Sequence, residues 1–398
     1  MQLCFFEDSN FTNFHPLTLT RPVDDLRTGI FTISEKWSHA LKTSHISRVL
    51  RPVLNNIFDS GNIDESQNCI WINSRYLPTP DLVEKISNLN EGQCLQFGDD
   101  IIAASVNGRD SASWHDAGLP EFKNLFVLET THYPSITNLW DLFLLNGDQI
   151  TRDLEFIDGS SPVATDISGQ AVLENSDNIY AQKGATVEAG CVLNAEKGPI
   201  FIGKNATVMA GSYIRGPVAI CENSSIKMGA RIYPDTTVGP VCKVGGEVSN
   251  TIFHSYSNKA HDGYIGNSVV GQWCNFGAGT TVSNLKTNYS PIRLTDWETG
   301  REIDTNQQFL GVVMGDHTKT AINCVINSGS IFGVNCNILS RDFPPKFVDS
   351  FSWVGSNVIQ RYNLGKAYQA MKKMMARRDV PFTNAYADLM KQIFELSR

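Results

Sequence analysis

The chain has no apolar run that approaches the roughly 18 residues of a membrane-spanning helix, which argues against an integral membrane protein. It has no excess of positive charge either, because 33 Lys and Arg residues face 41 Asp and Glu residues, for a net charge of −8. Proteins held to nucleic acid mainly by phosphate contacts are normally basic, so the composition disfavours that class. The first residues, MQLCFFED, lack the basic and then apolar stretches of a signal peptide, so we expect a cytoplasmic protein.

Paired cysteine motifs are also missing. The nine cysteines are scattered between Cys4 and Cys336 without a CxxC pair. An odd and dispersed set indicates buried, reduced thiols rather than a disulfide framework or a zinc site. What is present is typical of a globular protein: 398 residues, enough for about two domains, with 41% hydrophobic and 19% charged residues.

The first part of the chain has the pattern of a mixed α/β domain. Short apolar runs predict strands over residues 3–6, 69–72 and 101–106. Helical spacing predicts helices over residues 33–41 and 138–156. The sequence DGSSP at residues 158–162 is typical of a turn or linker, so we expect the α/β domain to span residues 1–158.

Beyond this linker an apolar residue recurs at every sixth position. The first block comprises eight such residues: Ile202, Val208, Ile214, Ile220, Ile226, Ile232, Val238 and Val244. A second block comprises Ile252, Tyr264, Val270, Phe276 and Val282 with Asn258 as its polar member, and a third comprises Met314, Thr320, Ile326, Phe332 and Ile338. Helices repeat near 3.6 residues and strands at 2, so neither gives a period of six. The pattern predicts a parallel β-helix with three hexads in each triangular coil and the apolar position facing inward.

Two segments depart from the repeat. Residues 283–310 are too polar for the core and predict a loop extruded from one coil. Residues 363–378 return to helical spacing with a basic cluster, which predicts a helix that caps the open end of the coils. We therefore expect a β-helix domain over residues 159–345 and a helical segment over residues 346–398.

A candidate catalytic group lies within the repeat. His261 and Gly279 are eighteen positions apart, which is one coil, so they are expected to stack at roughly the 4.8 Å strand spacing. A histidine with an ordinary pKa near 6.5 can accept a proton at neutral pH, as a general base must. Small residues beside the histidine would let backbone N–H groups stabilise the oxyanion. For His254 and His317 we expect structural roles.

Residues 260–285, AHDGYIGNSVVGQWCNFGAGTTVSNL, resemble the acetyltransferase active-site stretch of the bifunctional enzymes that make UDP-N-acetylglucosamine. These are the glucosamine-1-phosphate N-acetyltransferases and N-acetylglucosamine-1-phosphate uridylyltransferases. Residues 314–323, MGDHTKTAIN, are especially similar to the archaeal and Bacteroidetes-type branch. The resemblance implies a left-handed β-helix that forms homotrimers, with active sites between subunits and acetyl-CoA as cosubstrate.

The resemblance also implies roles for single residues. It makes His261 the general base, Asn284 and Asn275 substrate- and base-orienting groups, and Tyr264 a sugar-phosphate contact. It places Ala278 near acetyl-CoA.

Further implied contacts lie outside this stretch. Lys243 resembles a phosphate contact and Glu247 a neighbouring acid, but Ser249 stands where the bacterial enzymes have a substrate-binding lysine. Arg293 in the extruded loop is our candidate to replace that lysine. Because the phosphates of CoA attract cations, Lys319 and Arg341 are candidate coenzyme contacts.

The N-terminal domain resembles a reduced, Rossmann-like sugar-phosphate nucleotidylyltransferase. Residues 15–22, HPLTLTRP, are similar to the opening segment of that family, and residues 133–142 to its closing segment. However, the glycine-rich phosphate loop is absent, and Glu7 and Asp8 stand where it would be. Arg21 and Asn73 are the candidate nucleotide contacts.

Two Gly-Asp pairs are poor candidates for Mg²⁺ binding. The pair at 98–99 precedes a strand and predicts a hairpin turn, and the pair at 147–148 lies in a predicted helix. We therefore assign no metal ligand, although an active nucleotidylyltransferase would use Mg²⁺.

Together these patterns predict an enzyme of nucleotide-sugar synthesis. It would transfer acetyl from acetyl-CoA to an amino-sugar 1-phosphate, with nucleotidyl transfer from UTP or another NTP as the second activity. Two alternatives stay open. One is a non-catalytic protein that binds nucleotide sugars or acetyl-CoA, and the other is an acyltransferase for a different sugar.

Overall fold

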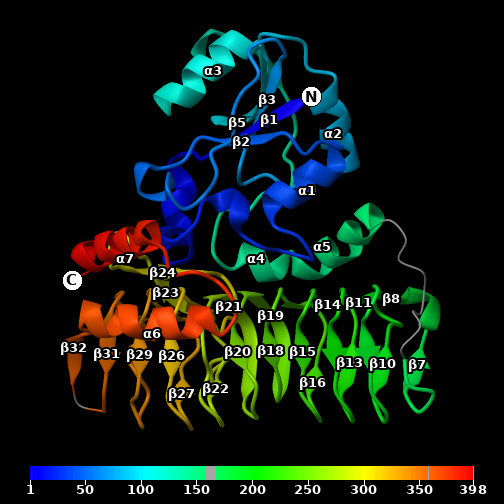
Figure 1. Ribbon diagram of the computed structural model, residues 1–398, viewed down its shortest axis with the longest axis vertical. Helices are drawn as coiled ribbons and strands as arrows, with labels where there is room; N and C mark the ends of the chain where they lie inside the picture. Colours follow the sequence, from blue (N-terminus) through cyan, green and yellow to red (C-terminus); the bar gives the residue numbers. More distant parts are fainter. Residues whose placement is uncertain (158–166, 357, 398) are drawn as a thin grey trace. The chain divides into compact units, whose positions relative to one another are not determined.

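The computed structural model describes residues 1–157, 167–356 and 358–397 (Figure 1). The predicted linker at 158–162 lies outside the described residues. Within the described residues, no helix is long and apolar enough to cross a membrane. All nine cysteines are buried and unpaired.

The chain divides into two compact units. The first comprises residues 1–14, 20–26 and 31–137, and the second comprises residues 15–19, 27–30 and 138 onward. Two short segments near the N-terminus, together with α4 (Asp141–Leu144) and α5 (Asn146–Asp153), are thus grouped with the β-helix. For example, the Thr237 hydroxyl of the β-helix donates to the Gly29 carbonyl at 3.0 Å.

The first unit is built on a six-stranded mixed sheet of order β2-β1-β3-β5-β4-β6. Its strands are β1 (Gln2–Phe6), β2 (Ile46–Arg48), β3 (Cys69–Asn73), β4 (Gln93–Phe97), β5 (Asp100–Val106) and β6 (Phe126–Glu129), and its helices are α1 (Ile33–Ala40), α2 (Pro80–Ser87) and α3 (Gly108–Ala117). β1 pairs in parallel with β2 and β3 and is buried along its whole length, which explains its continuous apolar run. The predicted strands and the first helix are confirmed, as is the turn at Gly98, which has a φ of +58° between β4 and β5.

The second unit is a parallel β-helix whose short strands stack coil upon coil (Figure 1). Its largest sheet contains β7 (Val172–Glu174), β8 (Ile179–Ala181), β10 (Val192–Asn194), β11 (Ile200–Ile202), β13 (Tyr213–Arg215), β14 (Val218–Ile220), β16 (Arg231–Ile232), β17 (Thr236–Val238), β19 (Glu247–Ser255), β21 (Tyr264–Gln272), β25 (Val312–Met314), β28 (Ser330–Phe332) and β30 (Phe347–Val348). A further face contains β9 (Thr186–Val187), β12 (Thr207–Val208), β15 (Ser225–Ile226), β18 (Lys243–Val244) and β20 (Asn258–Lys259), and it continues with β26 (Lys319–Thr320), β29 (Asn337–Ile338), β31 (Ser352–Val354) and β32 (Ile359–Arg361). Asn275 joins the two groups, because it bridges Asn258 and Lys319. β22 (Thr281–Val282) pairs with β27 (Val325–Ile326).

The period of six arises because one side chain per hexad faces the interior. All eight residues of the first block belong to a single buried apolar cluster. Strand partners such as Ser225 and Lys243 lie eighteen positions apart, which is one coil of three hexads. The expected fold class, an α/β domain followed by a parallel β-helix and C-terminal helices, is confirmed.

In the second block the predicted phase is wrong by one residue at three positions. The register pairs Val238 with Phe253, Val244 with Lys259 and Val248 with Ile265, so these partners occupy the inward positions. Residues 252, 258 and 264, which the hexad pattern assigned to the core, are therefore each one position out of register. The cause is the coil length, since Glu247 and Tyr264 are paired only seventeen residues apart in the nine-residue strands β19 and β21.

The extruded loop is confirmed. After β22 the chain leaves the coil, forms an antiparallel hairpin of β23 (Arg293–Thr295) and β24 (Glu302–Asp304), and returns at β25. Leu294 of the hairpin is buried, and Trp297 packs edge-on against Phe347 with ring centroids 5.1 Å apart. The loop is thus folded back on the coils.

The C-terminal helix is also confirmed, as α6 (Leu364–Ala376), and a second helix that the sequence did not reveal follows, α7 (Asn384–Leu396). The predicted role of α6 as an end cap is wrong. Ala370 and Met374 of α6 line a cavity together with Lys243 and Asn258, so the helix lies along a side of the β-helix. The helix lies along this side because it is amphipathic, and its apolar face is buried at Ala367, Met371 and Met375.

Candidate active site

His261 lies on the turn that joins β20 to β21. The turn is held close to the next coil by Gly263, which has a φ of +118°. A Cβ atom at this position would lie 2.0 Å from the Thr280 carbonyl oxygen, so only glycine fits. The tight turn keeps His261 on the outside of the β-helix, where its side chain is exposed.

An open cavity of about 480 Å³ surrounds His261. Its walls include Ala278 and Gly279 of the next coil. The predicted partner of His261, Gly279, is one position out of register, because Asn258 pairs with Asn275 only seventeen residues on. The Gly279 N–H is already used, because it donates to the Asp262 carbonyl at 3.0 Å. The Ala278 N–H makes no hydrogen bond within the part of the chain that the structure describes, so it is one amide of this lining that a ligand can use.

A buried lysine supports the same turn. Lys259 is 2% exposed, and its Nζ donates to the carbonyl oxygens of Gly245 and His261, both at 2.9 Å. Burial lowers its pKa to about 8. Sequence reasoning missed this residue because the phase was one residue off, and a lysine at an inward hexad position is the signal that would have found it.

Tyr264 and Asn284 form a polar group on the outer face of β21. Asn284 Nδ2 donates to the Tyr264 hydroxyl at 2.9 Å and to Asn267 Oδ1 at 2.7 Å. Burial raises the pKa of Tyr264. Asn284 is thus bonded to the tyrosine, whereas the His261 side chain makes no hydrogen bond among the described residues.

Glu247 and Arg231 lie on the same strand ladder as Tyr264. Arg231, Glu247 and Tyr264 are successive partners in the register of β16, β19 and β21. The Arg231 Nε lies 3.4 Å from Glu247 Oε2. Sequence reasoning missed Arg231, because its sixteen-residue spacing from Glu247 departs from the regular coil.

Arg293, the candidate replacement for a lysine at Ser249, pairs instead across its own hairpin. Its guanidinium lies 3.7 Å from Glu302, and both side chains are well exposed. Ser249 lies on β19, two residues after Glu247, and is paired with Gly266 of the next coil. Arg231 is therefore the arginine that the register places on this face.

Lys243, Asn275 and Lys319 line a second cavity, next to α6. Lys319 Nζ donates to the His317 carbonyl at 2.7 Å, and burial lowers its pKa to about 8. Arg341 is exposed just after β29. The predicted coenzyme contacts are thus divided, with Ala278 beside His261 and Lys319 in the other cavity.

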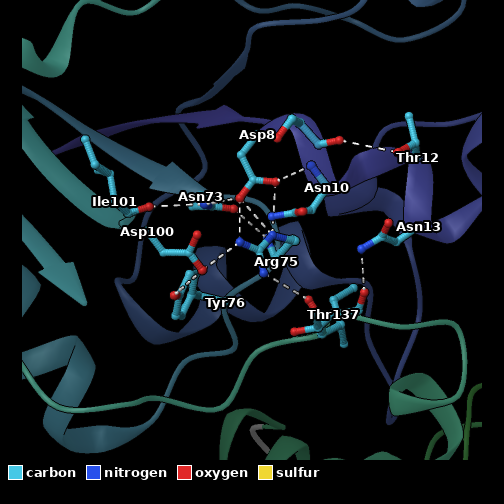
Figure 2. A network of polar contacts seen from close by, with 12 residues as sticks. Asp8, Asn10, Thr12, Asn13, Asn73, Arg75, Tyr76, Asp100, Ile101 and Thr137 are labelled. Atoms are coloured by element: carbon cyan, nitrogen blue, oxygen red, sulfur yellow. Dashed lines mark hydrogen bonds and ion pairs between the residues drawn. The ribbon is translucent and has the colours of Figure 1, made fainter. Parts of the chain in front are cut away.

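The predicted nucleotide contacts of the first unit are engaged with carboxylates. Arg21 is 1% exposed and lies 3.1 Å from Asp25, and Asn73 donates to Asp8 at 3.0 Å. Figure 2 shows that Arg75 lies between two acids, with its Nη2 2.5 Å from Asp8 and 2.9 Å from Asp100.

Electrostatics stabilise Asp8 as an anion. Burial alone would raise its pKa, but hydrogen bonds from Arg75 and Asn73 outweigh burial and lower it. Glu7 differs, since burial raises its pKa although Arg51 lies 2.7 Å away. The loop after β1 therefore presents internally paired carboxylates where a phosphate loop would present bare amides.

Comparison with known proteins agrees with the motifs in both parts of the chain. Residues 3–161 match the sugar nucleotidyl transferase family. The chain is also 32% identical over 162 residues to a bifunctional sugar-1-phosphate nucleotidylyltransferase/acetyltransferase of Sulfurisphaera tokodaii, a match that covers 40% of this chain and 39% of that protein. The resemblance to the bifunctional family is thereby confirmed.

A second relative has a similar name. The bifunctional protein GlmU of Methanococcus vannielii is 33% identical over 225 residues, which cover 55% of this chain and 47% of that protein. The chain thus spans less than half the length of these curated relatives. Among solved structures, the Francisella novicida UDP-N-acetylglucosamine acyltransferase aligns with 58% of this chain and 92% of its own, at 14% identity and a TM-score of 0.31.

Proposed function

We propose that the β-helix transfers an acetyl group from acetyl-CoA to the amine of an amino-sugar 1-phosphate, glucosamine 1-phosphate by resemblance, in the cytoplasm. The observation that carries this proposal is the cavity that both the exposed His261 and Ala278 line, since the Ala278 N–H makes no hydrogen bond among the described residues. A general base and an oxyanion donor are the two groups that acyl transfer to an amine requires.

The chemistry follows from these two groups. The imidazole of His261 accepts a proton from the substrate amine as its nitrogen attacks the thioester carbon. The Ala278 N–H donates to the carbonyl oxygen as negative charge develops on it. The carbon–sulfur bond then breaks, and the CoA thiolate leaves and takes up a proton.

Recognition of the sugar phosphate is assigned to the face that bears Tyr264, Asn284 and Glu247. This face includes Arg231, whose guanidinium can donate two parallel hydrogen bonds to a phosphate. Asn284 and Tyr264 supply an amide and a hydroxyl for sugar hydroxyl groups. In this proposal acetyl-CoA is the acyl donor and the amino-sugar 1-phosphate is the acceptor. Both are substrates, so acetyl transfer needs no further bound cofactor.

We propose further that three chains assemble with active sites between subunits. Two apolar side chains at the His261 cavity, Met228 and Ile322, are 72% and 71% exposed. Large apolar side chains that stay exposed around a polar site are typical of a surface that another chain covers. A second subunit would bring its sugar-binding face to this histidine.

Release of the CoA thiol in the presence of glucosamine 1-phosphate tests the proposal. His261→Ala and His261→Gln are expected to lower kcat by roughly 10²- to 10⁴-fold. His45→Ala, at an exposed histidine of the first unit, is the matched control and is expected to retain full activity. Unchanged turnover in both His261 variants would remove this residue from the mechanism, and a panel of other amino and hydroxyl sugars tests the alternative acceptor.

For the first unit we propose nucleotidyl transfer to the same sugar 1-phosphate, supported by the family match over residues 3–161. Mg²⁺, which such a reaction uses, is commonly held by one or two carboxylates together with the substrate phosphates, and Asp8 and Asp100 of this unit do not offer free carboxylates for it. Among the described residues no group of three metal-binding side chains occurs, and Arg75 neutralises the two neighbouring acids, Asp8 and Asp100.

The paired carboxylates of the β1 loop favour a second candidate for this unit, in which it binds nucleotide sugars without catalysis. Pyrophosphate release from UTP, dTTP or GTP with N-acetylglucosamine 1-phosphate separates the two candidates. Release supports transfer, whereas calorimetric binding of the nucleotide or of UDP-N-acetylglucosamine without release supports a binding domain.

A further inference from the structure

The cavity beside α6 is lined by an unusual concentration of positive charge. It has a volume of about 360 Å³ and lies between the outer face of β18, β20 and β26 and the side of α6. Five of its lining residues are cationic, namely Lys243, Lys319, Lys373, Arg377 and Arg378, and none is acidic. The chain as a whole carries a net charge of −8, so this concentration runs against its composition.

These cations are not paired with acids. Within residues 1–157, 167–356 and 358–397, the side chains of Lys243, Lys373, Arg377 and Arg378 take part in no ion pair or hydrogen bond. The first unit shows the opposite arrangement, since Arg75 is bonded to acids there. Four like charges held together without counter-ions repel one another, and an anion bound among them would relieve that repulsion.

The neighbouring cations affect the pKa of Lys243. The charge of the neighbouring Arg378 lowers the pKa of Lys243. Burial and the charges of other cations lower it further. The cations of this cavity thus repel one another. A ligand that carries two or more negative charges would reduce this repulsion and so bind favourably.

Other lining groups are suited to an organic ligand. Tyr256 and Trp273 are stacked, with ring centroids 4.2 Å apart and an interplanar angle of 12°, and form a flat wall. Asn258 contributes a buried side-chain oxygen that has no hydrogen-bond partner. A hydroxyl group of a ligand could donate to this oxygen, which is otherwise costly to bury.

We propose that this cavity binds the phosphate group of a phosphorylated small molecule, at a site separate from the His261 cavity. The lining residues of the two cavities are different. A volume of about 360 Å³ lies at the small end of ligand sites and admits a phosphosugar or a diphosphate, but not a whole coenzyme. The site does not depend on the proposed acetyl transfer.

The phosphate can come from two sources. One is the phosphorylated end of CoA, whose remaining length would lie outside the cavity. The other is an independent ligand, such as a sugar phosphate that binds beside the catalytic site and regulates it. The same cations would recognise both, so competition between ligands distinguishes them.

Isothermal titration calorimetry of the full chain with pyrophosphate, adenosine 3′,5′-bisphosphate and glucosamine 1-phosphate tests the proposal. We expect at least one to bind, and the double variant Arg377→Ala/Arg378→Ala to weaken that binding about tenfold or more, since each lost contact is a charge-assisted hydrogen bond. Lys372→Ala, an exposed neighbour on α6 that does not line the cavity, is the matched control and is expected to bind as the wild type does.

Lys243→Met on the opposite wall provides a second variant, should α6 detach in the first, and it is expected to weaken binding as well. Circular dichroism of each variant verifies the fold. Displacement of the bound probe by acetyl-CoA would identify the coenzyme as the source, and simultaneous binding of both would identify an independent ligand. Absence of binding by all three probes, or equal affinity in wild type and both cavity variants, would overturn the proposal.

Discussion

Replacement of Lys259 by methionine is expected to change how the stability of the β-helix depends on pH. The lysine occupies an inward position and is 2% exposed, so its charge is held in a poorly solvated site. Burial lowers the pKa of Lys259 to about 8, whereas an unfolded lysine titrates near its ordinary value of about 10.4.

The sign of the effect follows from these two values. Below about pH 8 the lysine is protonated in both states, and the folded protein bears the full cost of burying the charge. As the pH rises from about 8 to about 10.4, the folded state loses the proton before the unfolded state does, so this lysine's contribution to the free energy of unfolding increases. Between pH 7 and pH 9.5 the increase amounts to about 2 kcal/mol.

The assay is urea unfolding of wild type and Lys259→Met at pH 7, 8, 9 and 9.5 and constant ionic strength. Other groups titrate in this range, including the buried Lys319, so the quantity to follow is the difference between the two proteins. That difference is expected to shift in favour of the wild type by about 2 kcal/mol across the series. The methionine fills a similar volume but leaves the carbonyls of Gly245 and His261 without their donor, an effect that is constant with pH.

Lys204→Met, at an exposed lysine of the same β-helix, controls for the loss of a positive charge as such. Its stability is expected to follow that of the wild type at a constant offset. If the curves of wild type and Lys259→Met also ran parallel, to within about 0.5 kcal/mol, the lysine would titrate alike in both states and the argument from burial would be refuted.

Three further predictions concern the candidate active site. Tyr264→Phe removes the hydroxyl that accepts from Asn284, and we expect KM for the sugar phosphate to rise about three- to tenfold with a smaller change in kcat, measured by steady-state kinetics. Ile322→Glu places a charge at the exposed apolar rim, and light scattering is expected to show monomers; an unchanged trimer would contradict the assigned interface. Gly263→Ala forces a methyl group against the Thr280 carbonyl, and we expect urea unfolding to show a loss of about 2 kcal/mol or more, while wild-type stability would mean that the turn adapts.

Most of the β-helix was predictable because its physics is local and repetitive. One inward apolar residue in each hexad is enough to specify the coils, and the positions from Ile202 to Val244 occupy the core as expected. The loop after Val282 followed from the same period, and so did the placement of His261 beside the next coil, to within one residue. The motif around His261 then indicated the chemistry.

Predictions failed where the period itself changed. The pairing of Glu247 with Tyr264 at seventeen residues shifts the phase by one, which hid Lys259 and Ile265 from the sequence pattern. Similarly, the spacing of sixteen residues between Arg231 and Glu247 could be recognised only from the register. A count along the chain cannot reveal a coil that is one or two residues short.

The amino-acid sequence by itself determined the two architectures, the solenoid's inward face and the histidine on its outer corner, because each depends on spacing within a few hexads. Tertiary structure alone decided which charges are neutralised. It paired Arg75 with Asp8 and Asp100, residues 67 and 25 positions apart from it, and it laid α6 along the solenoid so that Arg377 and Arg378 face Lys243. These contacts depend on how segments that are distant in the sequence pack together, so no local sequence pattern predicts them.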